Sequence, residues 1–528
     1  MVANVVLRVG VDVGGTNTDA VVVDDTRVLG ACKSPTTPDV TTGIVTAVSA
    51  ALAAARLAPS ALQAVMIGTT HFTNALVERR RLAPVAIVRL ALPATTGVLP
   101  RADWPEDLKA AIGDHTYLVA GGHEYDGRVL SPLDEAEVVK VAHDLRSRGI
   151  TQVALVGVFA PVNPEAELRA AEILRHEYPE VQVTLSHRLG GIGLLERENA
   201  TLLNAALMPE AVRVTAALEH AMRTLGLAVP LFISQNDGTL MTPSEIGNYP
   251  VLTFASGPTN SMRGAAFLSG LKDALVIDIG GTTSDVGVLA GGFPRQAGMA
   301  VRLAGVRTNF RMPDLLAIGL GGGSLVREQP DGRIVIGPDS VGYKLTDEAL
   351  VFGGNTLTAT DVAVAAGRAD IGDRARVAHL SAGLVQRGLD EMQRMLEQAI
   401  DRVKTSAEPV PVVLVGGGAV LVGNELAGAS HVVRPEQAGC ANAIGASIAQ
   451  VSGEFDSILA YTDNGRAAAL EQARQTALQR AEAAGARPGS SVIFSVEEVP
   501  MAYMPGGGTR VRVKAVGDLA IGNMGSRP

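Results

Sequence analysis

A short glycine-containing motif occurs twice, about half the chain apart, and constrains the fold more than any other feature. The first copy is Asp12-Val-Gly-Gly-Thr-Asn-Thr-Asp19 and the second is Asp278-Ile-Gly-Gly-Thr-Thr-Ser-Asp285. Each copy lies between two apolar, β-branched runs, which predicts a strand, a tight turn and a second strand. The glycine pair lets the backbone approach a ligand closely, because no Cβ intervenes. The repeat predicts two related α/β halves that hold a polyphosphate from two sides.

Both turns have the chemistry of a phosphate and metal site. Backbone N–H groups in a glycine turn form an anion-binding concavity. We expect Asp12 and Asp278 to face each other across a cleft and to hold Mg²⁺ through oxygen or water ligands. The predicted nucleotide-binding residues of the two turns are Gly14, Gly15, Thr16, Asn17, Thr18, Gly280, Gly281, Thr282 and Thr283. One copy alone would equally suit a structural hairpin, whereas two copies favour a nucleotide. The sequence has no GxxxxGK[ST] P-loop, so a Walker site is not predicted.

Composition and charge exclude several classes of protein. The chain has 528 residues, too many for one compact core, so two or three domains are expected. Hydrophobic residues make up 47% and aromatic residues 3% of the sequence, which favours β-branched strands packed against Ala-rich helices. A net charge of −9 disfavours a nucleic-acid partner, since phosphate binding requires clustered Lys and Arg.

Cysteine usage and hydropathy favour a cytoplasmic protein. Cys32 and Cys440 lie far apart and lack metal-binding spacing, so neither a disulfide framework nor a structural zinc site is expected. The amino terminus lacks the basic and apolar regions of a secretory signal. No uninterrupted apolar run reaches the length of a membrane span, so no membrane partner is predicted.

Alternating helix and strand patterns predict βαβ units and a parallel sheet. Ser131 as N-cap, followed by Pro132, predicts the start of a helix that ends at Gly149. Further helices are expected to begin at Asn163-Pro164 and to cover Asn74–Arg80 and Leu194–Leu207.

Two changes in pattern divide the chain. A glycine-rich segment over residues 186–193 interrupts the βα alternation, and the composition shifts near residue 456. The predicted domains are therefore 1–189, 190–455 and 456–528. The third is expected to be a small α+β element that contains one helix and a β-hairpin.

A third glycine loop suggests a known architecture. Val412 to Val415 reads as a strand and is followed by Gly416, Gly417 and Gly418. In this order, the three glycine segments resemble the actin-like ATPase superfamily of sugar kinases, Hsp70 chaperones and actin. That resemblance implies a two-lobed α/β fold with duplicated domains, in which the third loop holds the adenosine of ATP. It also implies that one carboxylate carries the metal, while the other shares the metal or orients the attacking group.

Four segments narrow the resemblance. They are Val9–Ala20, Gly68–Arg79, Gly121–Gly127 and Ile318–Ser324. Together they are similar to the hydantoinase A/5-oxoprolinase family, over about residues 5 to 455, and the chain resembles a short A-type subunit. The resemblance implies an enzyme that uses ATP to open a cyclic amide such as a hydantoin, an N-methylhydantoin, 5-oxoproline or another lactam. It further implies a B-type hydantoinase subunit as partner and an oligomeric assembly.

Two alternatives remain open at this stage. Related subunits in the same family serve acetone or acetophenone carboxylases. From a different class, the chain could be a nucleotide switch that activates a partner enzyme through domain closure.

Further polar residues are candidates for substrate or metal binding. Thr69, Thr70, His71 and Asn74 lie where a strand leads into a helix, and they could hold a polar ring or simply form a helix cap around a semi-buried His. Arg197, Asn199 and Asn204 could line the cleft or form a solvated helix face. The His123, Glu124 and Asp126 loop is a weak candidate metal site, because no second His has suitable spacing.

Overall fold

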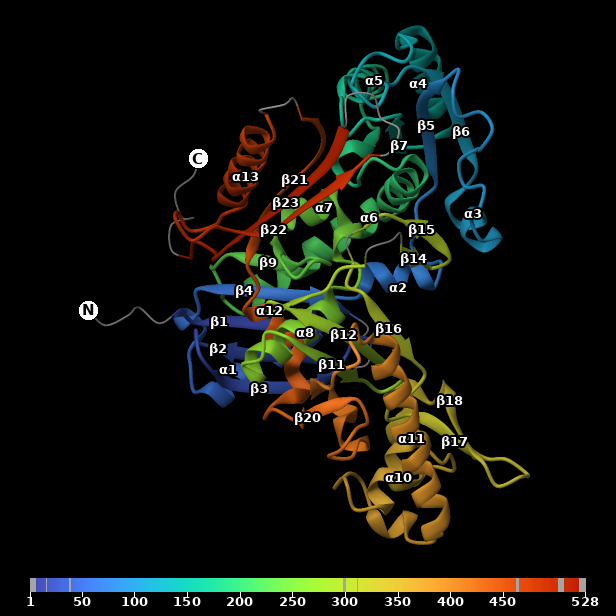
Figure 1. The fold of residues 1–528 in the computed structure, drawn as a ribbon. Coiled ribbons are helices and arrows are strands. Elements are labelled where there is room, and N and C mark those ends of the chain that lie inside the picture. The colour runs from blue at the N-terminus through green and yellow to red at the C-terminus, as the bar shows by residue number, and fades with distance from the viewer. Residues whose placement is uncertain are drawn as a thin grey trace.

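The computed structural model describes residues 6–15, 17–37, 39–297, 301–310, 312–461, 465–501 and 508–521. Thr16, one of the predicted phosphate-binding residues, lies outside the described residues. The chain folds around two central sheets, each built on one copy of the glycine motif (Figure 1). A third sheet lies at one end, and the carboxyl-terminal sheet packs against the first.

The first sheet contains the first copy of the motif and has the strand order β10-β9-β4-β1-β2-β3. β1 and β2 form an antiparallel hairpin, β4 lies parallel to β1, and β9 lies parallel to β4. The strands are β1 (Arg8–Val13), β2 (Asn17–Val23), β3 (Val28–Pro35), β4 (Ala64–Thr69), β9 (Leu231–Ser234) and β10 (Leu240–Met241). Their apolar side chains share a core with α1 (Val40–Ala55) and α6 (Leu194–Thr224).

The second sheet repeats this arrangement in the order β13-β12-β11-β19-β20, with β16 paired to β12. β11 and β12 form the equivalent hairpin, and β19 lies parallel to β11. The strands are β11 (Ala274–Ile279), β12 (Ser284–Ala290), β13 (Phe293–Pro294), β16 (Leu315–Ile318), β19 (Val410–Val415) and β20 (Ala429–Val433). Helices α10 (Ala359–Ala365) and α11 (Ala382–Val403) complete its core. The predicted duplication is therefore confirmed at the level of strand pairing.

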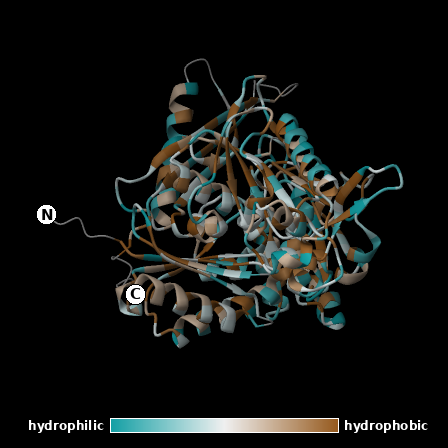
Figure 2. Ribbon diagram, turned by 90° about the horizontal axis from the view of Figure 1, so that it is seen from below, coloured by the Kyte–Doolittle hydropathy of each residue, from teal (hydrophilic) through white to brown (hydrophobic). Residues whose placement is uncertain are grey.

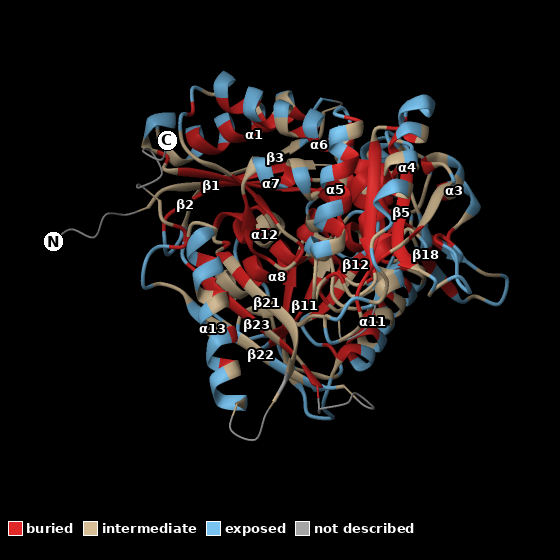
Figure 3. Ribbon diagram, turned by 90° about the horizontal axis from the view of Figure 1, so that it is seen from above, coloured by how far each residue is buried: buried red, intermediate tan, exposed pale blue. Residues whose placement is uncertain are grey.

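Two buried helices lie between these sheets, as Figure 3 shows. They are α8 (Ser256–Ser269) and α12 (Ala441–Ser447). A Cβ on Gly264 of α8 would lie 2.0 Å from the Ala441 carbonyl oxygen, and a Cβ on Gly10 of β1 would lie 2.0 Å from the Ala443 carbonyl oxygen. Only glycine permits such approaches. α12 is thereby held between α8 and the strand that carries Asp12.

The third sheet is parallel throughout, in the order β6-β5-β7-β8. Its strands and helices are β5 (Val85–Leu92), β6 (His115–Ala120), β7 (Gln152–Gly157), β8 (Gln182–Leu185), α4 (Glu135–Arg148) and α5 (Glu165–Glu177). The parallel sheet expected from the βαβ pattern is thus present.

The carboxyl-terminal sheet is antiparallel, in the order β21-β23-β22. Its elements are β21 (Val451–Ala460), α13 (Arg466–Ala483), β22 (Val492–Pro500) and β23 (Gly508–Gly517), so the expected helix and hairpin are observed. Its core includes Met66 of β4 and Phe232 of β9. β21 runs across the predicted boundary at residue 455, and the first sheet takes β9 and β10 from beyond residue 190. The sheets therefore do not follow the three predicted domains, and that division stays a prediction.

Helix boundaries differ from the expectation at three places. Ser131 is not an N-cap, because α4 begins at Glu135 and the Asp134 side chain accepts a hydrogen bond of 3.0 Å from the Glu137 N–H. The helix expected to end at Leu207 runs to Thr224, with a proline inside it. Its second half packs into the core of the first sheet, which compensates for the hydrogen bond that proline cannot donate. The helix after β4 covers residues 71–77 instead of 74–80.

The remaining elements are short. They are α2 (His71–Val77), α3 (Glu106–Ile112), α7 (Pro243–Asn248), α9 (Leu345–Glu348), β14 (Val301–Leu303), β15 (Val306–Thr308), β17 (Ser324–Glu328) and β18 (Ile334–Ser340). Figure 2 shows hydrophobic residues along the interior strands and hydrophilic residues on the peripheral helices and loops. Among the described residues, no helix combines the length and apolar character needed to cross a membrane.

Candidate active site

Four carboxylates occupy equivalent positions in the two central hairpins. Asp12 on β1 lies opposite Asp19 on β2, and Asp278 on β11 lies opposite Asp285 on β12. Opposed residues of an antiparallel pair place their side chains on the same face of the sheet. Each copy of the motif therefore contributes a pair of neighbouring carboxylates. The first member of each pair, Asp12 or Asp278, is the one that the sequence predicts as a metal ligand.

The first pair of carboxylates, Asp12 and Asp19, is buried, and only one oxygen of each has a hydrogen-bond or ion-pair partner. Asp12 and Asp19 each expose 6% of their surface. Asn442 on α12 donates a hydrogen bond of 3.2 Å from Nδ2 to Asp12 Oδ2, and Lys33 Nζ lies 2.6 Å from Asp19 Oδ2. The Oδ1 atom of each carboxylate is buried without a partner among the described residues. Buried polar atoms are normally paired, so these oxygens indicate a site for a ligand.

Burial raises the pKa of the carboxylates in both hairpins. The pKa of Asp12 rises to about 7, mainly through burial and further through the neighbouring Asp19 charge. Burial likewise raises the pKa of Asp278, and burial together with the Asp278 charge raises the pKa of Asp285 to about 6. Like charges in a desolvated site repel one another, and a bound cation relieves that repulsion.

The residues present fit a magnesium ion. Mg²⁺ commonly binds one or two carboxylates and completes its shell with water and phosphate oxygens. Asp12 and Asp19 offer carboxylate oxygens without partners. Within the described part of the chain, no three His, Cys, Asp or Glu side chains are arranged to hold a metal by themselves. The donor set therefore suits a cation completed by water and phosphate.

A cavity of about 230 Å³ lies between the two motif turns. The predicted residues that line it are Asp12, Gly14, Gly15, Asn17, Asp278, Gly280, Thr283, Gly416 and Gly417. Thr18 does not line it: its side chain is fully buried and its Oγ1 lies 3.3 Å from Thr36 Oγ1. Gly281, Thr282 and Gly418 also lie outside the lining. The structure thus places two turns and a third glycine loop around one polar space.

The third glycine loop packs directly onto the second motif. Gly416 has a φ of +84°, and a Cβ there would lie 2.3 Å from Asp278 Oδ1 and 2.4 Å from the Ile279 carbonyl oxygen. Glycine is required on both grounds. A Cβ on Gly418 would meet the Ile279 side chain at 2.4 Å, so this glycine provides the close packing behind the loop.

A second cavity of about 680 Å³ continues from the first and shares Gly416, Gly417, Ala438 and Gly439 with it. Arg368 and Arg434 lie in its wall. Arg434 donates a hydrogen bond of 2.7 Å to the Val422 carbonyl oxygen, and Arg368 donates one of 3.1 Å to the Leu421 carbonyl oxygen. The arrangement can accommodate a polyphosphate in the small cavity and a nucleoside in the large one.

Another glycine cluster supports the second turn from behind. The Gly322 N–H donates to the Gly280 carbonyl oxygen at 3.0 Å, and the Gly323 N–H donates to the Gly281 carbonyl oxygen at 2.7 Å. A Cβ on Gly321 would lie 2.6 Å from the Thr282 backbone. These bonds hold the carbonyl groups of Gly280 and Gly281 in place within the turn.

The predicted substrate residues lie at the carboxyl end of β4, next to β1. Thr69 Oγ1 and His71 Nδ1 are 2.8 Å apart, and Asn74 Nδ2 donates to Thr70 Oγ1 at 3.4 Å. Thr69 is buried and His71 is half-buried, burial lowers the pKa of His71, and Asn74 is exposed. Ser256, at the start of α8, donates to the Thr69 carbonyl oxygen at 3.5 Å. Their role stays a prediction.

The polar residues of α6 do not form a solvated face. Arg197, Asn199 and Asn204 are buried, at 0%, 4% and 0% exposure, and none lines the two cavities described above. Arg197 donates to the Gly157 carbonyl oxygen at 2.6 Å and to that of Gly191 at 2.9 Å. Because backbone acceptors satisfy it, Arg197 fastens the glycine-rich 186–193 segment.

The His123 loop is not arranged as a metal site. Asp126 is engaged by Arg128, whose Nε lies 2.6 Å from Asp126 Oδ2. As noted above, the described residues contain no three-residue metal group.

Several residues of the site were not identified from the sequence. Lys33 and Asn442 contact the carboxylates, and Arg368, Arg434 and Gly439 line the cavities. The only sequence signal for Lys33 is that it is a cationic residue in the strand that follows the first motif. Asn442 has no sequence signal, since its approach to Asp12 depends on the packing of α12.

Comparison with known proteins identifies the family. The hydantoinase/oxoprolinase N-terminal region matches residues 8–178, and the hydantoinase/oxoprolinase domain matches residues 197–373. The chain belongs to the hydantoinase/oxoprolinase family. Both motif hairpins fall within the matched regions of this family member.

Curated relatives of this family member include subunits of larger enzymes. The acetophenone carboxylase gamma subunit of Aromatoleum aromaticum is 28% identical over 68% of this chain and 53% of its own length. The caprolactamase subunit alpha of Pseudomonas jessenii is 27% identical over 77% of this chain and 59% of its own length. The chain thus spans little more than half the length of these relatives.

Solved structures of the family show the same fold. The crystal structure of ATP-dependent caprolactamase from Pseudomonas jessenii has a TM-score of 0.78 at 21% identity, over 97% of this chain and 87% of that chain. Nucleotide-free acetone carboxylase has a TM-score of 0.67 at 18% identity, over 99% of this chain and 89% of that chain. The expected two-lobed, actin-like α/β architecture is confirmed.

Proposed function

We propose that this family member is an A-type subunit that uses ATP to phosphorylate a cyclic amide and so activates it for ring-opening hydrolysis. One observation carries the proposal. Two motif turns and a third glycine loop line a small polar cavity that continues into a larger one, and buried carboxylates lie in the wall of the small cavity. That shape and chemistry suit a nucleoside triphosphate with its metal.

The reaction explains why such a subunit would use ATP. An unstrained amide carbonyl is a poor electrophile. Attack of the carbonyl oxygen on the γ-phosphorus forms an O–P bond and releases ADP, which leaves an imidate phosphate. Water then adds to the carbonyl carbon, and the ring C–N bond breaks as the nitrogen takes a proton, which leaves an acyl phosphate. A second water hydrolyses the acyl phosphate to a carboxylate and inorganic phosphate. The first step depends mainly on positioning and charge stabilisation.

The residues of the site would divide this work. The N–H groups of the two glycine turns hold phosphate oxygens, and Lys33 adds a positive charge beside them. Asp12 and Asp278 carry Mg²⁺ or orient the attacking group, and Gly416, Gly417 and Gly418 face or support the adenosine. Mg²⁺, when bound, would offset the charge of the phosphates. Thr69, Thr70, His71 and Asn74, at the end of β4, would border the acceptor on the side that faces the nucleotide.

The partner belongs to the same proposal. The chain is expected to act with a B-type hydantoinase subunit that completes the hydrolysis, in a hetero-oligomer. The names of the curated relatives, which are subunits of multi-subunit enzymes, support this expectation.

A second candidate is a subunit of an ATP-dependent acetone- or acetophenone-type carboxylase. It is supported by the acetophenone carboxylase subunit, whose 28% identity to this chain is equivalent to the 27% of the caprolactamase subunit. A nucleotide switch is the candidate from another class.

Nucleotide turnover separates the three candidates. ADP formation is measured with cyclic amides, with ketones plus bicarbonate, and with a partner subunit alone. Stimulation by cyclic amides, with ring opening in proportion to ADP, supports the first proposal. Stimulation of ADP formation by ketones plus bicarbonate supports the carboxylase subunit. Stimulation by the partner subunit alone supports the nucleotide switch.

A further inference from the structure

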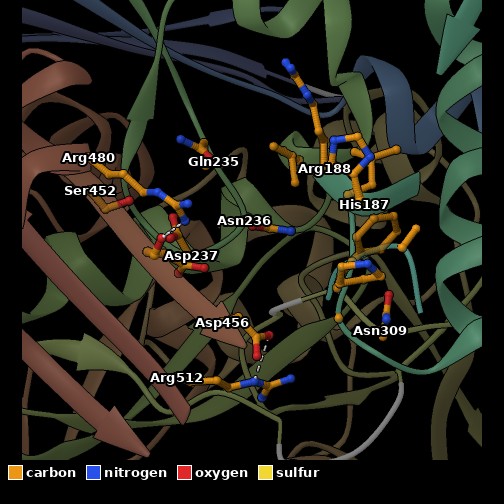
Figure 4. Close-up of a pocket in the computed structure, with 18 of the residues that line it drawn as sticks. His187, Arg188, Gln235, Asn236, Asp237, Asn309, Ser452, Asp456, Arg480 and Arg512 are labelled. Atoms are coloured by element: carbon orange, nitrogen blue, oxygen red, sulfur yellow. Dashed lines mark hydrogen bonds and ion pairs between the residues drawn. The ribbon is translucent and has the colours of Figure 1, made fainter. Parts of the chain in front are cut away.

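A third cavity, of about 530 Å³, lies outside the nucleotide site (Figure 4). It is within the size range of small-molecule sites. Its wall comes from the loops after β7, β8 and β9, from the segment after β15, and from β21, β23 and α13. The family relationship and the proposed nucleotide chemistry assign no role to this cavity.

The topology of the sheets directs three strands at this cavity. β7 and β8 are parallel neighbours in the third sheet, and β9 is parallel to β4 in the first. The cavity is lined by Ala160, by His187 to Gly191 and by Gln235 to Asp237, which follow the carboxyl ends of these three strands. In α/β proteins, ligands bind outside the carboxyl ends of parallel strands. The cavity therefore lies where such folds place a ligand.

Two amide side chains in the wall lack partners. Asn236 exposes 4% of its surface, and its Nδ2 is buried without a hydrogen-bond acceptor among the described residues. Asn309 Oδ1 is likewise buried without a donor. In Figure 4 the Asn236 side chain points toward the side of the cavity where His187 and Asn309 lie. One unsatisfied donor and one unsatisfied acceptor match the carbonyl and the N–H of an amide.

The aspartates of the wall are already neutralised. Asp237 Oδ2 lies 2.6 Å from Lys514 Nζ, and both side chains are buried. Asp456 Oδ2 lies 2.7 Å from an Arg510 nitrogen and 3.2 Å from Arg512 Nε. Because these aspartates are paired within the protein, and Arg188 and Arg480 also lie in the wall, the cavity disfavours a cationic ligand.

We propose that this cavity binds the acceptor of the phosphoryl group, a cyclic amide, with Asn236 Nδ2 donating to the ring carbonyl and the ring N–H donating to Asn309 Oδ1. This inference rests on the proposed function and locates its substrate.

The position of the cavity relative to Asp12 is compatible with that role. Asp12 pairs with Gly68 of β4, and Ile67 pairs with Ile233 of β9, so Ser234 falls in the same row as Asp12. Neighbouring strands are about 5 Å apart, which places the end of β9 about 10 Å from β1. Thr69, at the end of β4, lies between them. The Asn236 carbonyl oxygen also accepts a hydrogen bond of 2.8 Å from Thr259 Oγ1 on α8.

Direct binding to the full chain tests the assignment without nucleotide. Saturation-transfer NMR would measure the Kd of 2-pyrrolidinone, hydantoin, 5-oxoproline and ε-caprolactam. We expect at least one ring to bind, and Asn236→Asp, which keeps the shape but replaces the donor by an acceptor, to raise its Kd about ten-fold or more. Asn309→Ala should weaken it similarly. Ser234→Ala is the matched control, because it removes another unpartnered buried polar atom from β9 without touching the cavity wall.

A matched ligand tests the acceptor. N-methyl-2-pyrrolidinone lacks the N–H, so it should bind more weakly than 2-pyrrolidinone to the wild type and should be insensitive to Asn309→Ala. Binding of no ring, or a Kd unchanged by both Asn236→Asp and Asn309→Ala, overturns the assignment. If rings stimulate ADP formation while these variants leave Kd and KM unchanged, the proposed function stands and the cavity assignment fails. If rings bind in an Asn236-dependent way without any ADP formation, the cavity stands and the proposed function fails.

Discussion

Asn442 donates a hydrogen bond of 3.2 Å to Asp12, although 430 positions separate the two residues in the chain. The bond joins α12 to β1 at the point where the first motif faces the cavity. It also lowers the pKa of Asp12 against the larger effect of burial, which raises it. The carboxylate at the centre of the site is therefore tuned by a residue from the far end of the chain.

Removal of this bond should alter the pH dependence of catalysis. In Asn442→Ala the carboxylate loses its donor, so the pKa of Asp12 should rise further. The acidic limb of the ATPase–pH profile should then shift to higher pH than in the wild type. An unchanged limb would show that Asp12 ionisation does not control turnover.

Asp12 should also make the nucleotide-free protein less stable as the pH rises. Its pKa is about 7 in the folded state, above the ordinary value of 3.8, so the folded state holds the proton more tightly than the unfolded state. Stability conferred by the protonated carboxyl is present below about pH 4 and is lost between about pH 4 and 7. Each unit of pKa shift corresponds to about 1.4 kcal/mol, so the loss reaches a few kcal/mol.

Denaturant unfolding of the wild type and Asp12→Asn at pH 5 and pH 8 measures this effect. The advantage of the variant in free energy of unfolding should be larger at pH 8. An equal difference at both pH values would contradict the raised pKa.

The third glycine loop should not tolerate a side chain at Gly416. Gly416→Ala places a Cβ against Asp278 and the Ile279 carbonyl at a positive φ. We expect a loss of about 1–3 kcal/mol from the backbone conformation, with the clash in addition. In Gly417→Ala, by contrast, the Cβ meets no protein atom within 4 Å and the φ is ordinary, so its stability should change by less than about 1 kcal/mol. Equal stability of the two variants in thermal unfolding would refute the packing described for this loop.

Local sequence patterns predict much of the architecture. The two hairpins could be predicted because glycine pairs between β-branched runs have few alternative conformations. Asp134 caps α4 in place of Ser131 because a second capping residue lay three positions further on, and a sequence pattern does not rank two adequate caps. The end of α6 was missed because tertiary packing outweighs the local effect of Pro209.

The rest depended on contacts between distant segments. Lys33 and Asn442 reach the carboxylates only through the register of β3 and the packing of α12. From the sequence, Arg197 could line the cleft or belong to a solvated helix face, whereas in the structure carbonyl groups of the 186–193 segment enclose it. The cavity that contains Asn236 and Asn309 lies where three sheets meet, and no local sequence pattern predicts such a meeting point.

One measurement tests the central claim most directly. ADP release and ring opening are measured for the wild type and for Asp12→Asn, with ATP, Mg²⁺ and a panel of cyclic amides. Each assay is run with and without a B-type subunit. We predict that a cyclic amide stimulates ADP release in the wild type, that one ADP accompanies each opened ring when the partner is present, and that Asp12→Asn lowers the rate by about 100-fold or more while remaining folded. Turnover that ignores every cyclic amide, or an Asp12→Asn variant with the wild-type rate, would contradict the account.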